Sequence, residues 1–186
     1  MQKPNQRSLR TITLGAIVVV IFSALTTFAL RRERLIDAWR PTNYNVSITL
    51  NDSLTEITQA QTDIDIVALK PLQVIDLDFG ELKTDSVTLN DKPVPFLHQN
   101  GKLQITLPTT IAPKTNLQIS VTYHGKPKDG LILSKDKDGK PSVVGDNWPD
   151  RVHHWIPCFD HPSAKATITF SVSAPNRDIV VANGHL

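Results

Sequence analysis

The sequence predicts an all-β fold, an antiparallel saddle-like β-sandwich that is preceded by one transmembrane helix. Two observations carry this prediction: a stretch of twenty uncharged residues near the amino terminus, and twofold apolar alternation through most of the remaining chain. A third is that no amphipathic helical pattern lies between the alternating segments. With 186 residues, of which 40% are hydrophobic, the chain is long enough for one domain with a sizeable core.

The uncharged stretch is residues 11–30, TITLGAIVVVIFSALTTFAL, and twenty residues are what an α-helix needs to cross the hydrocarbon core. Basic residues flank it on both sides, so we expect residues 1–10 to be a cytoplasmic tail, 11–30 an uncleaved anchor and 31–40 a linker. A cleaved signal peptide ending near Ala29 is the weaker alternative, because arginines follow it directly. A short tail before a long β-rich segment favours a single-pass membrane protein whose β domain, residues 41–186, lies outside the cytoplasm.

The β domain is predicted from apolar side chains that recur at every second position. A turn is expected at RPTN, residues 40–43, and further turn signals separate the alternating segments. The polar segment 134–146 is expected to be an exposed loop or hairpin tip, and its Asp-x-Asp-Gly fragment lacks the glutamate that a calcium loop needs. The predicted strands cover residues 44–50, 64–68, 75–79, 87–89, 103–107, 117–123 and 166–172.

Charge and cysteine content exclude two further classes of protein. A net charge of +2, with no basic stripe interleaved with aromatic residues, argues against a nucleic-acid partner. The single cysteine, Cys158, rules out an internal disulfide, so packing has to hold the fold together.

The densest cluster of reactive side chains is DNWPDRVHHWIPCFDHP, residues 146–162. His153, His154, Cys158 and His161 are all competent metal ligands. In an extended chain the two adjacent histidines point to opposite faces, and no H-E-x-x-H supplies a second cluster, so we expect no metal here. An independent metal protein stays open as a minor alternative.

The structural interpretation of this stretch is stronger than a catalytic one. Cys158 lies between a proline and Phe159 in an apolar setting, which is typical of an inert buried thiol rather than a nucleophile. Trp155, Ile156 and Phe159 are predicted core anchors, and the Asp160 carboxylate is expected to accept backbone N–H bonds in a local turn. With Lys165 expected to pair with a carboxylate, the stretch is predicted to be a pinned crossover between sheets.

The same region resembles a known family. WIPCFDHPSAKATITFSVSAP, residues 155–175, is similar to a block in the amino-terminal domain of the aminopeptidase N family of zinc metallopeptidases. VVANGHL, residues 180–186, resembles that family's next element, a strand that ends in a Ser-Asn-Gly turn, with Ala182 in place of the serine. The positions that match the family are Pro157, Cys158, Asp160, Pro162, Lys165, Ala166, Asn183 and Gly184.

The resemblance also implies where substrate would lie. In the family, a glutamine or glutamate upstream of this block helps to hold the free α-amine of the peptide. An ungapped count puts Trp148 at that position, so Asp146 or Asn147 would serve only if the loop shifts.

The catalytic motifs of the family, Gly-x-Met-Glu-Asn and H-E-x-x-H, do not occur, and the only methionine is Met1. The resemblance therefore implies the non-catalytic amino-terminal domain of a membrane-anchored zinc aminopeptidase-like protein, incomplete at its C-terminal end. The full-length parent would use zinc to hydrolyse N-terminal residues from peptides, whereas this chain would hold no cofactor and would meet peptide only beside a catalytic domain. The alternative is a stand-alone, membrane-tethered β-sandwich binding module.

One physical expectation concerns association. An unpaired sheet edge templates pairing with another chain, and either segment 167–172 or segment 178–182 is predicted to lie at such an edge. We therefore expect residues 35–186 alone to be poorly soluble or to self-associate.

Overall fold

The computed structural model describes residues 37–185, and the predicted anchor at 11–30 lies outside these residues. The described part contains eleven strands and one short 3-10 helix, which confirms the all-β prediction. No helix in this part is long and apolar enough to span a membrane.

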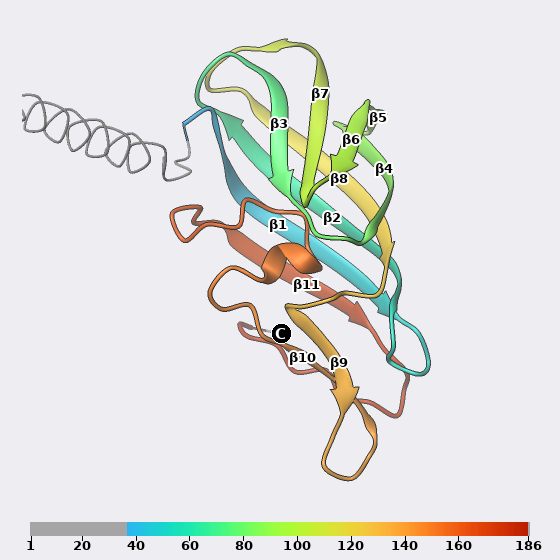
Figure 1. The fold of residues 1–186 in the computed structure, drawn as a ribbon. Helices are drawn as coiled ribbons and strands as arrows, with labels where there is room; N and C mark the ends of the chain where they lie inside the picture. The colour runs from blue at the N-terminus through green and yellow to red at the C-terminus, as the bar shows by residue number, and fades with distance from the viewer. Residues whose placement is uncertain (1–36, 186) are drawn as a thin grey trace, which may run out of the picture. The chain divides into compact units, whose positions relative to one another are not determined.

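The largest sheet has six strands in the order β11-β1-β2-β8-β4-β5 (Figure 1). Apolar side chains alternate with polar ones along these strands, so one face packs on the core and the other faces solvent. The strands are β1 (Trp39–Leu50), β2 (Ile57–Ala68), β4 (Lys83–Leu89), β5 (Lys92–Pro93), β8 (Asn116–Gly125) and β11 (Thr167–Ser173).

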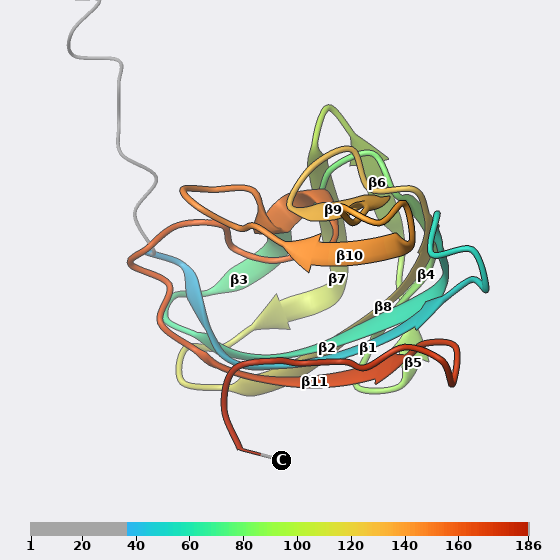
Figure 2. The same ribbon diagram turned by 90° about the horizontal axis from the view of Figure 1, so that it is seen from below.

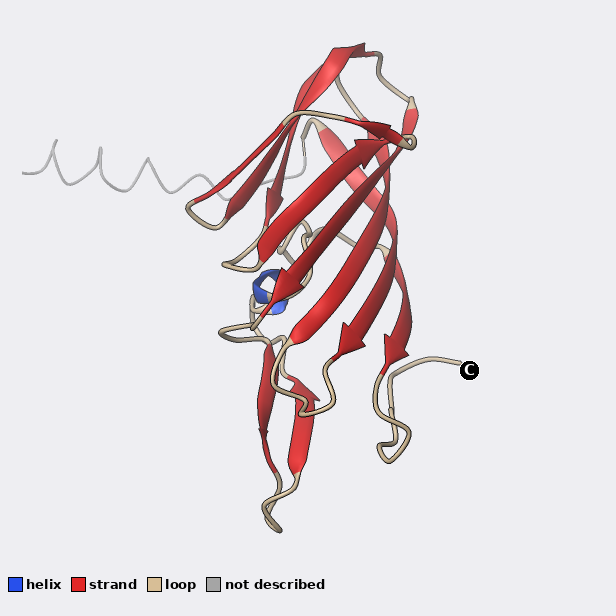
Figure 3. Cartoon of the chain, turned by 90° about the vertical axis from the view of Figure 1, so that its right-hand side faces the viewer, coloured by secondary structure: helices blue, strands red, loops and turns tan. Residues whose placement is uncertain are grey.

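Two smaller sheets lie on the concave side of the six-stranded sheet (Figure 2). One is the three-stranded sheet β3-β7-β6, built from β3 (Leu72–Asp78), β6 (Phe96–Gln99) and β7 (Lys102–Ile111). The other is the hairpin of β9 (Leu131–Lys135) and β10 (Pro141–Gly145), which extends beyond the end of the large sheet (Figure 3). Its tip lies at residues 136–140, which confirms the hairpin tip expected within 134–146.

The core fills the space between these layers. Tyr123 and Phe79 are fully buried and pack edge to face, with ring centroids 5.0 Å apart. The Tyr123 hydroxyl meets the buried Thr62 hydroxyl at 3.0 Å, so neither polar group is left unsatisfied. Burial raises the pKa of Tyr123, because the phenolate would lose its hydration there.

Three sequence predictions about the strands are wrong. The large sheet is mixed rather than antiparallel, because β11 pairs in parallel with β1 after a long crossover. RPTN is no turn: it lies inside β1, where an irregularity between Pro41 and Asn43 absorbs the proline. Residues 178–182 form no strand in the structure.

Candidate functional site

The residues that the sequence singled out form the crossover, residues 146–162, which leads from β10 back towards β11. It is anchored on the end of β3 by a two-way backbone bridge. The Asp78 N–H donates to the Cys158 carbonyl at 2.7 Å, and the Cys158 N–H donates to the Asp78 carbonyl at 3.0 Å. The predicted connection between sheets is confirmed.

Three aromatic and aliphatic side chains fix the crossover to the core. Trp155, Ile156 and Phe159 are buried, as predicted. The Trp155 ring stacks on Phe170 of β11 with centroids 6.0 Å apart, and Phe159 packs edge-on against Trp39 at 5.5 Å. Each buried side chain of this size stabilises the fold by roughly 1.5–3 kcal/mol, so these anchors hold the crossover firmly.

One backbone hydrogen bond and a buried thiol complete this anchor. The Phe159 N–H donates to the Tyr44 hydroxyl at 3.2 Å, and burial raises the pKa of Tyr44. The Cys158 thiol is buried beside them, as expected for an unreactive cysteine.

A buried carboxylate organises the polar side of the crossover. Asp78 is buried, and one of its oxygens accepts a hydrogen bond from the Lys102 ammonium while the other accepts the Asp160 N–H at 3.0 Å. Asp160 in turn accepts the His153 N–H at 3.2 Å and meets His153 Nδ1 at 2.7 Å. Asp160 therefore does accept a backbone N–H bond, but from a residue seven positions earlier rather than within a local turn.

The two adjacent histidines lie side by side, so the prediction that they point to opposite faces is wrong. They belong to the 3-10 helix Val152–His154, and their ring centroids are 4.2 Å apart. The Trp155 N–H donates to the Val152 carbonyl at 3.1 Å, which is the three-residue hydrogen bond that defines a 3-10 turn. This turn replaces the extended backbone on which the prediction depended. His154 Nδ1 lies 3.6 Å from a Glu81 carboxylate oxygen.

Even so, this cluster does not fit a metal ion. Within residues 37–185, no three His, Cys, Asp or Glu side chains converge in a way that would hold one. The zinc that the resemblance implies has no fitting set of ligands among residues 37–185.

The two candidate substrate-binding residues, Asp146 and Asn147, hold the start of the crossover in place. Asp146 accepts a hydrogen bond from the Arg151 guanidinium at 3.0 Å, and Asn147 Oδ1 accepts the Trp155 indole N–H at 2.8 Å. Trp148, the next residue of the crossover, is 78% exposed. In this arrangement both polar side chains face their own loop.

Arg151 also links the start of the crossover to the segment that precedes the β9–β10 hairpin. A nitrogen of its guanidinium lies 3.5 Å from a carboxylate oxygen of Asp129. The pKa of Asp129 is lowered, first by the hydrogen bond from the Gly130 N–H and then by Arg151. Gly130 has φ +74°, and a Cβ there would lie 2.2 Å from the Arg151 carbonyl oxygen. Only glycine allows the two chain segments to approach this closely.

The remaining motif residues divide by burial. Pro157 is buried, whereas Pro162, Lys165 and Ala166 are exposed, as are Asn183 and Gly184. No carboxylate of residues 37–185 lies within salt-bridge distance of Lys165, so its predicted ion pair is wrong for this part of the chain.

Sequence reasoning missed Asp78, Lys102, Gly130 and Arg151. Asp78 alternates with apolar residues in the same way as the exposed Asp76, so no local signal separates the two. Gly130 carried a signal, because it ends the turn-rich segment HGKPKDG, but its tight approach to Arg151 requires the tertiary fold.

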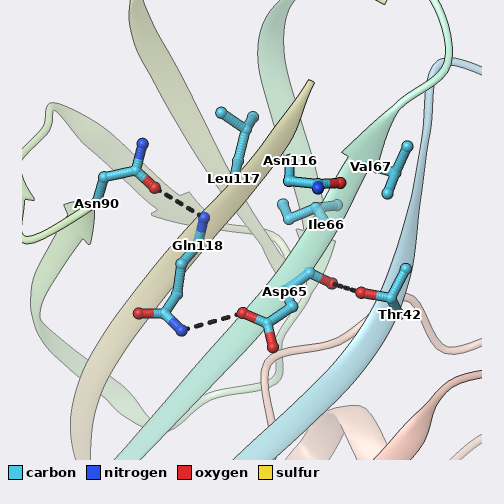
Figure 4. Close-up of a pocket in the computed structure, with 8 residues that line it drawn as sticks. All are labelled: Thr42, Asp65, Ile66, Val67, Asn90, Asn116, Leu117 and Gln118. Carbon is cyan, nitrogen blue, oxygen red and sulfur yellow. Dashed lines mark hydrogen bonds between the residues drawn. The ribbon is translucent and has the colours of Figure 1, made fainter. Parts of the chain in front are cut away.

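A hollow of about 400 Å³ lies elsewhere, on the six-stranded sheet (Figure 4). Gln118 spans it, donating its side-chain N–H to Asp65 at 3.0 Å and its backbone N–H to Asn90 Oδ1 at 3.0 Å. Its lining residues are Thr42, Asp65, Ile66, Val67, Asn90, Asn116, Leu117 and Gln118, so the hollow shares no residue with the crossover.

The domain is all-β, with one large curved sheet and two smaller ones. Its buried motif residues anchor the crossover that connects two of these sheets. A family model described as the Peptidase M1 N-terminal domain matches residues 40–186. The chain belongs to this family. A comparison with curated proteins gave no significant match.

Solved structures with the same fold include the M1 zinc metallopeptidase from Deinococcus radiodurans, at 22% identity and a TM-score of 0.64 over 77% of this chain. A substituted form of that enzyme bound to a Tyr-Ser-Ala substrate is similar at 21% identity and 0.64 over 74%. A two-domain M1 zinc metallopeptidase bound to L-tryptophan matches at 22% identity and 0.64 over 77%. The chain spans about a third of the length of these proteins, 33%, 33% and 34% respectively.

Proposed function

We propose that this chain is the non-catalytic amino-terminal domain of a membrane-anchored zinc aminopeptidase. The observation that carries the proposal is the family match over residues 40–186, in which the Pro157-Cys158 block forms the anchored crossover. The parent enzyme would remove N-terminal residues from peptides in a separate zinc-binding domain. The neighbouring structures are M1 zinc metallopeptidases, and this chain covers only 33% of the first of them, which supports that arrangement.

In the parent, this domain would form one wall of the active-site cleft and restrict access to free peptide ends. The crossover is suited to such a wall, because its core anchors and the Asp78 carboxylate hold its backbone rigidly. A role for Asp146 or Asn147 in binding the peptide amine requires these side chains to leave Arg151 and Trp155. Peptide binding by these residues thus depends on a shift of the loop when a catalytic domain is present.

The membrane part of the proposal rests on the sequence of residues 11–30 and its basic flanks. It places the chain as a single-pass membrane protein with the β domain outside the cytoplasm. Alkaline extraction of membranes tests the anchor: the full chain is expected in the pellet and a variant without residues 1–36 in the supernatant. Protease protection in sealed vesicles tests the orientation.

An aminopeptidase assay tests the catalytic part of the proposal. The purified full chain in detergent is incubated with added zinc and an amino-acid arylamide, with an M1 aminopeptidase as positive control. No turnover is expected. Turnover that a chelator abolishes would contradict the proposal and would mean that the histidines of the crossover hold a metal.

The alternative, a stand-alone membrane-tethered binding module, is favoured by one observation. A continuous apolar core runs from Trp39 to Phe159 within the described domain, as an independently folding module requires. Sequencing the DNA downstream separates the two: an in-frame H-E-x-x-H supports the aminopeptidase, and a stop codon followed by unrelated sequence supports the module.

A further inference from the structure

One end of the β domain brings together the start of β1 and two turns of the chain (Figure 1). The Leu69 N–H donates to the Ala38 carbonyl at 2.8 Å, which ties the turn between β2 and β3 to the start of β1. The Ala68 N–H donates to the Thr115 carbonyl at 3.0 Å, and the Lys114 N–H donates to the Ala68 carbonyl at 2.7 Å, so the turn between β7 and β8 joins them. We call this part of the domain the linker end; it consists of residues 37–40, 68–72 and 111–116.

The linker end is basic. Its positive charges are those of Arg40, Lys70 and Lys114, and Asp37 carries the one negative charge among these residues. The Lys70 ammonium lies 3.1 Å from the Asp37 carboxylate, but both side chains are more than half exposed, so water screens this pair. The adjoining turn, residues 90–92, contains one acid and one base and leaves the balance unchanged.

Apolar side chains are exposed among these basic residues. Leu69 is 40% exposed, and Pro71, Ala112 and Pro113 are also exposed. Apolar groups of this kind enter the headgroup region of a bilayer, while neighbouring lysine and arginine side chains meet the phosphates of anionic lipids. The linker end therefore combines the two kinds of group that a membrane surface attracts.

The linker end is also where the chain enters the β domain. Residues 31–36 connect the predicted anchor at 11–30 to Asp37. Even a fully extended chain of this length spans at most roughly 25 Å. A bilayer that holds the anchor consequently lies within that distance of Asp37. Every residue of the surface lies between positions 37 and 116, and the linker that brings it to the bilayer lies directly before them.

We infer that the linker end docks on the lipid headgroups of the membrane that holds the anchor, with Arg40, Lys70 and Lys114 on anionic lipid and Leu69 among the headgroups. This inference rests on the membrane-anchored part of the proposed function. It adds a second contact with the bilayer to the anchor itself, and this contact fixes which way the β domain faces.

Docking at this end turns the crossover away from the bilayer. Strand β3 begins at the linker end with Leu72 and ends at Asp78, which bridges to Cys158 of the crossover. A strand of seven residues is about 20 Å long. The hairpin tip, residues 136–140, lies at the opposite end of the domain (Figure 1). The proposed wall of the cleft is thus held clear of the lipid, where peptides reach it from solution.

Quenching of a fluorophore by lipid tests the inference in the full chain, reconstituted in vesicles of phosphatidylcholine and phosphatidylglycerol. The fluorophore is attached to Ala112→Cys at the linker end or to Lys137→Cys at the hairpin tip, and the vesicles contain a lipid with a nitroxide quencher on its headgroup. Quenching is expected at position 112 and not at position 137. Equal quenching at both positions, or none at position 112, would overturn the inference. Cys158 is buried, so the chain without an introduced cysteine is the labelling control.

Charge substitutions test the basic residues, with the fluorophore at position 112. Each basic residue close to an anionic surface strengthens attachment about fivefold, so Lys70→Gln with Lys114→Gln is expected to lower the ratio of docked to undocked chain about 25-fold. Lys135→Gln with Lys140→Gln removes the same charge near the hairpin tip and is expected to leave the quenching unchanged. Equal losses in the two double variants would contradict docking at the linker end, because only the net charge would then matter.

Flotation of the vesicles separates this inference from the anchor on which it rests. A full chain that floats with the vesicles but shows no quenching at position 112 would overturn the docking surface and leave the anchor intact. A chain that does not float would contradict the anchor, and the docking surface with it. Matching circular dichroism and melting curves check that the variants fold.

Discussion

The crossover, residues 146–162, and the C-terminal segment, residues 167–185, both contain motif residues of the family, yet the structure treats them differently. The crossover has three buried anchors and a carboxylate that is held at both oxygens. In the C-terminal segment, β11 has a single neighbouring strand among residues 37–185, and Ile179 and Val181 are 91% and 88% exposed. Motif residues thus belong to a well-anchored segment only where side chains of that segment are buried in the core.

Substitutions in the two regions are expected to change the free energy of unfolding by very different amounts. Since a domain is stable by only about 5–15 kcal/mol, one lost anchor in the crossover removes a large share of that total. Side chains that remain in water contribute little, so substitutions in the exposed part of the C-terminal segment have small effects on the free energy of unfolding.

The largest effect is expected at Gly130. Gly130→Ala places a Cβ 2.2 Å from the Arg151 carbonyl oxygen, at φ +74°, so the hairpin and the crossover cannot keep their contact. A loss of about 5 kcal/mol or failure to fold is expected, measured by chemical denaturation.

Gly139→Ala is the matched control, since Gly139 has φ +79° but nothing lies within 4 Å of its Cβ position. It is expected to cost about 1 kcal/mol from backbone strain alone. Equal effects of the two substitutions would show that the close approach at the crossover is unimportant.

Two tryptophans give the second comparison. Trp155→Ala removes a buried ring that stacks on Phe170, and it is expected to cost about 3–5 kcal/mol. Trp148→Ala, in the same crossover, removes a 78% exposed ring, and it is expected to change stability by about 0.5 kcal/mol or less. A larger effect of the exposed tryptophan in urea denaturation would contradict the anchored crossover described above.

The buried carboxylate is expected to matter less than the anchors. Asp78→Asn keeps an acceptor for the Asp160 N–H but loses the charge that pairs with Lys102, whose side chain is 48% exposed. A loss of about 1–2 kcal/mol is expected after allowing for solvent screening. Asp76→Asn, on the exposed side of the same strand, serves as the control, with about 0.5 kcal/mol or less expected. Comparable losses of stability for both variants would contradict the role of Asp78 in holding the polar side of the crossover.

A pH effect is expected at the junction between the hairpin and the crossover. The Gly130 N–H and Arg151 lower the pKa of Asp129 below its ordinary value of 3.8 in the folded chain. The ionised form therefore adds stability above about pH 4, and this contribution is lost as the pH falls through the folded pKa. Asp129→Asn is expected to reduce the acid sensitivity in this range, as followed by circular dichroism during acid titration. An unchanged acid transition would exclude this contribution.

The smallest effect is expected in the C-terminal segment. Ile179→Ser replaces a side chain that is 91% exposed, so the melting temperature should stay within about 1 °C of the wild type. A clear destabilisation would break the comparison, because it would show that this segment is ordered against the domain in solution.

The parts of the site that were predictable are those with a local signature. Trp155, Ile156 and Phe159 were recognisable as anchors because large apolar side chains in a charged, proline-rich stretch need an interior. The prediction that the paired histidines point apart was wrong, because it holds only for an extended chain and the backbone there turns into a 3-10 helix. Residues 178–182 were wrongly predicted to be a strand, because apolar, β-branched residues favour a strand even where no partner strand lies among residues 37–185.

The all-β class, the alternation of inner and outer faces and most core residues follow from the amino-acid sequence, because a period of two in apolar residues reports burial directly. Three features depend on the packing of distant segments. Strand β11 runs parallel to β1, Asp78 rather than Asp76 is buried, and Asp146 and Asn147 turn back onto Arg151 and Trp155. These outcomes depend on which distant segments meet. Local sequence patterns do not predict which distant segments pack together, because the free energy of that packing is gained only when the layers have assembled.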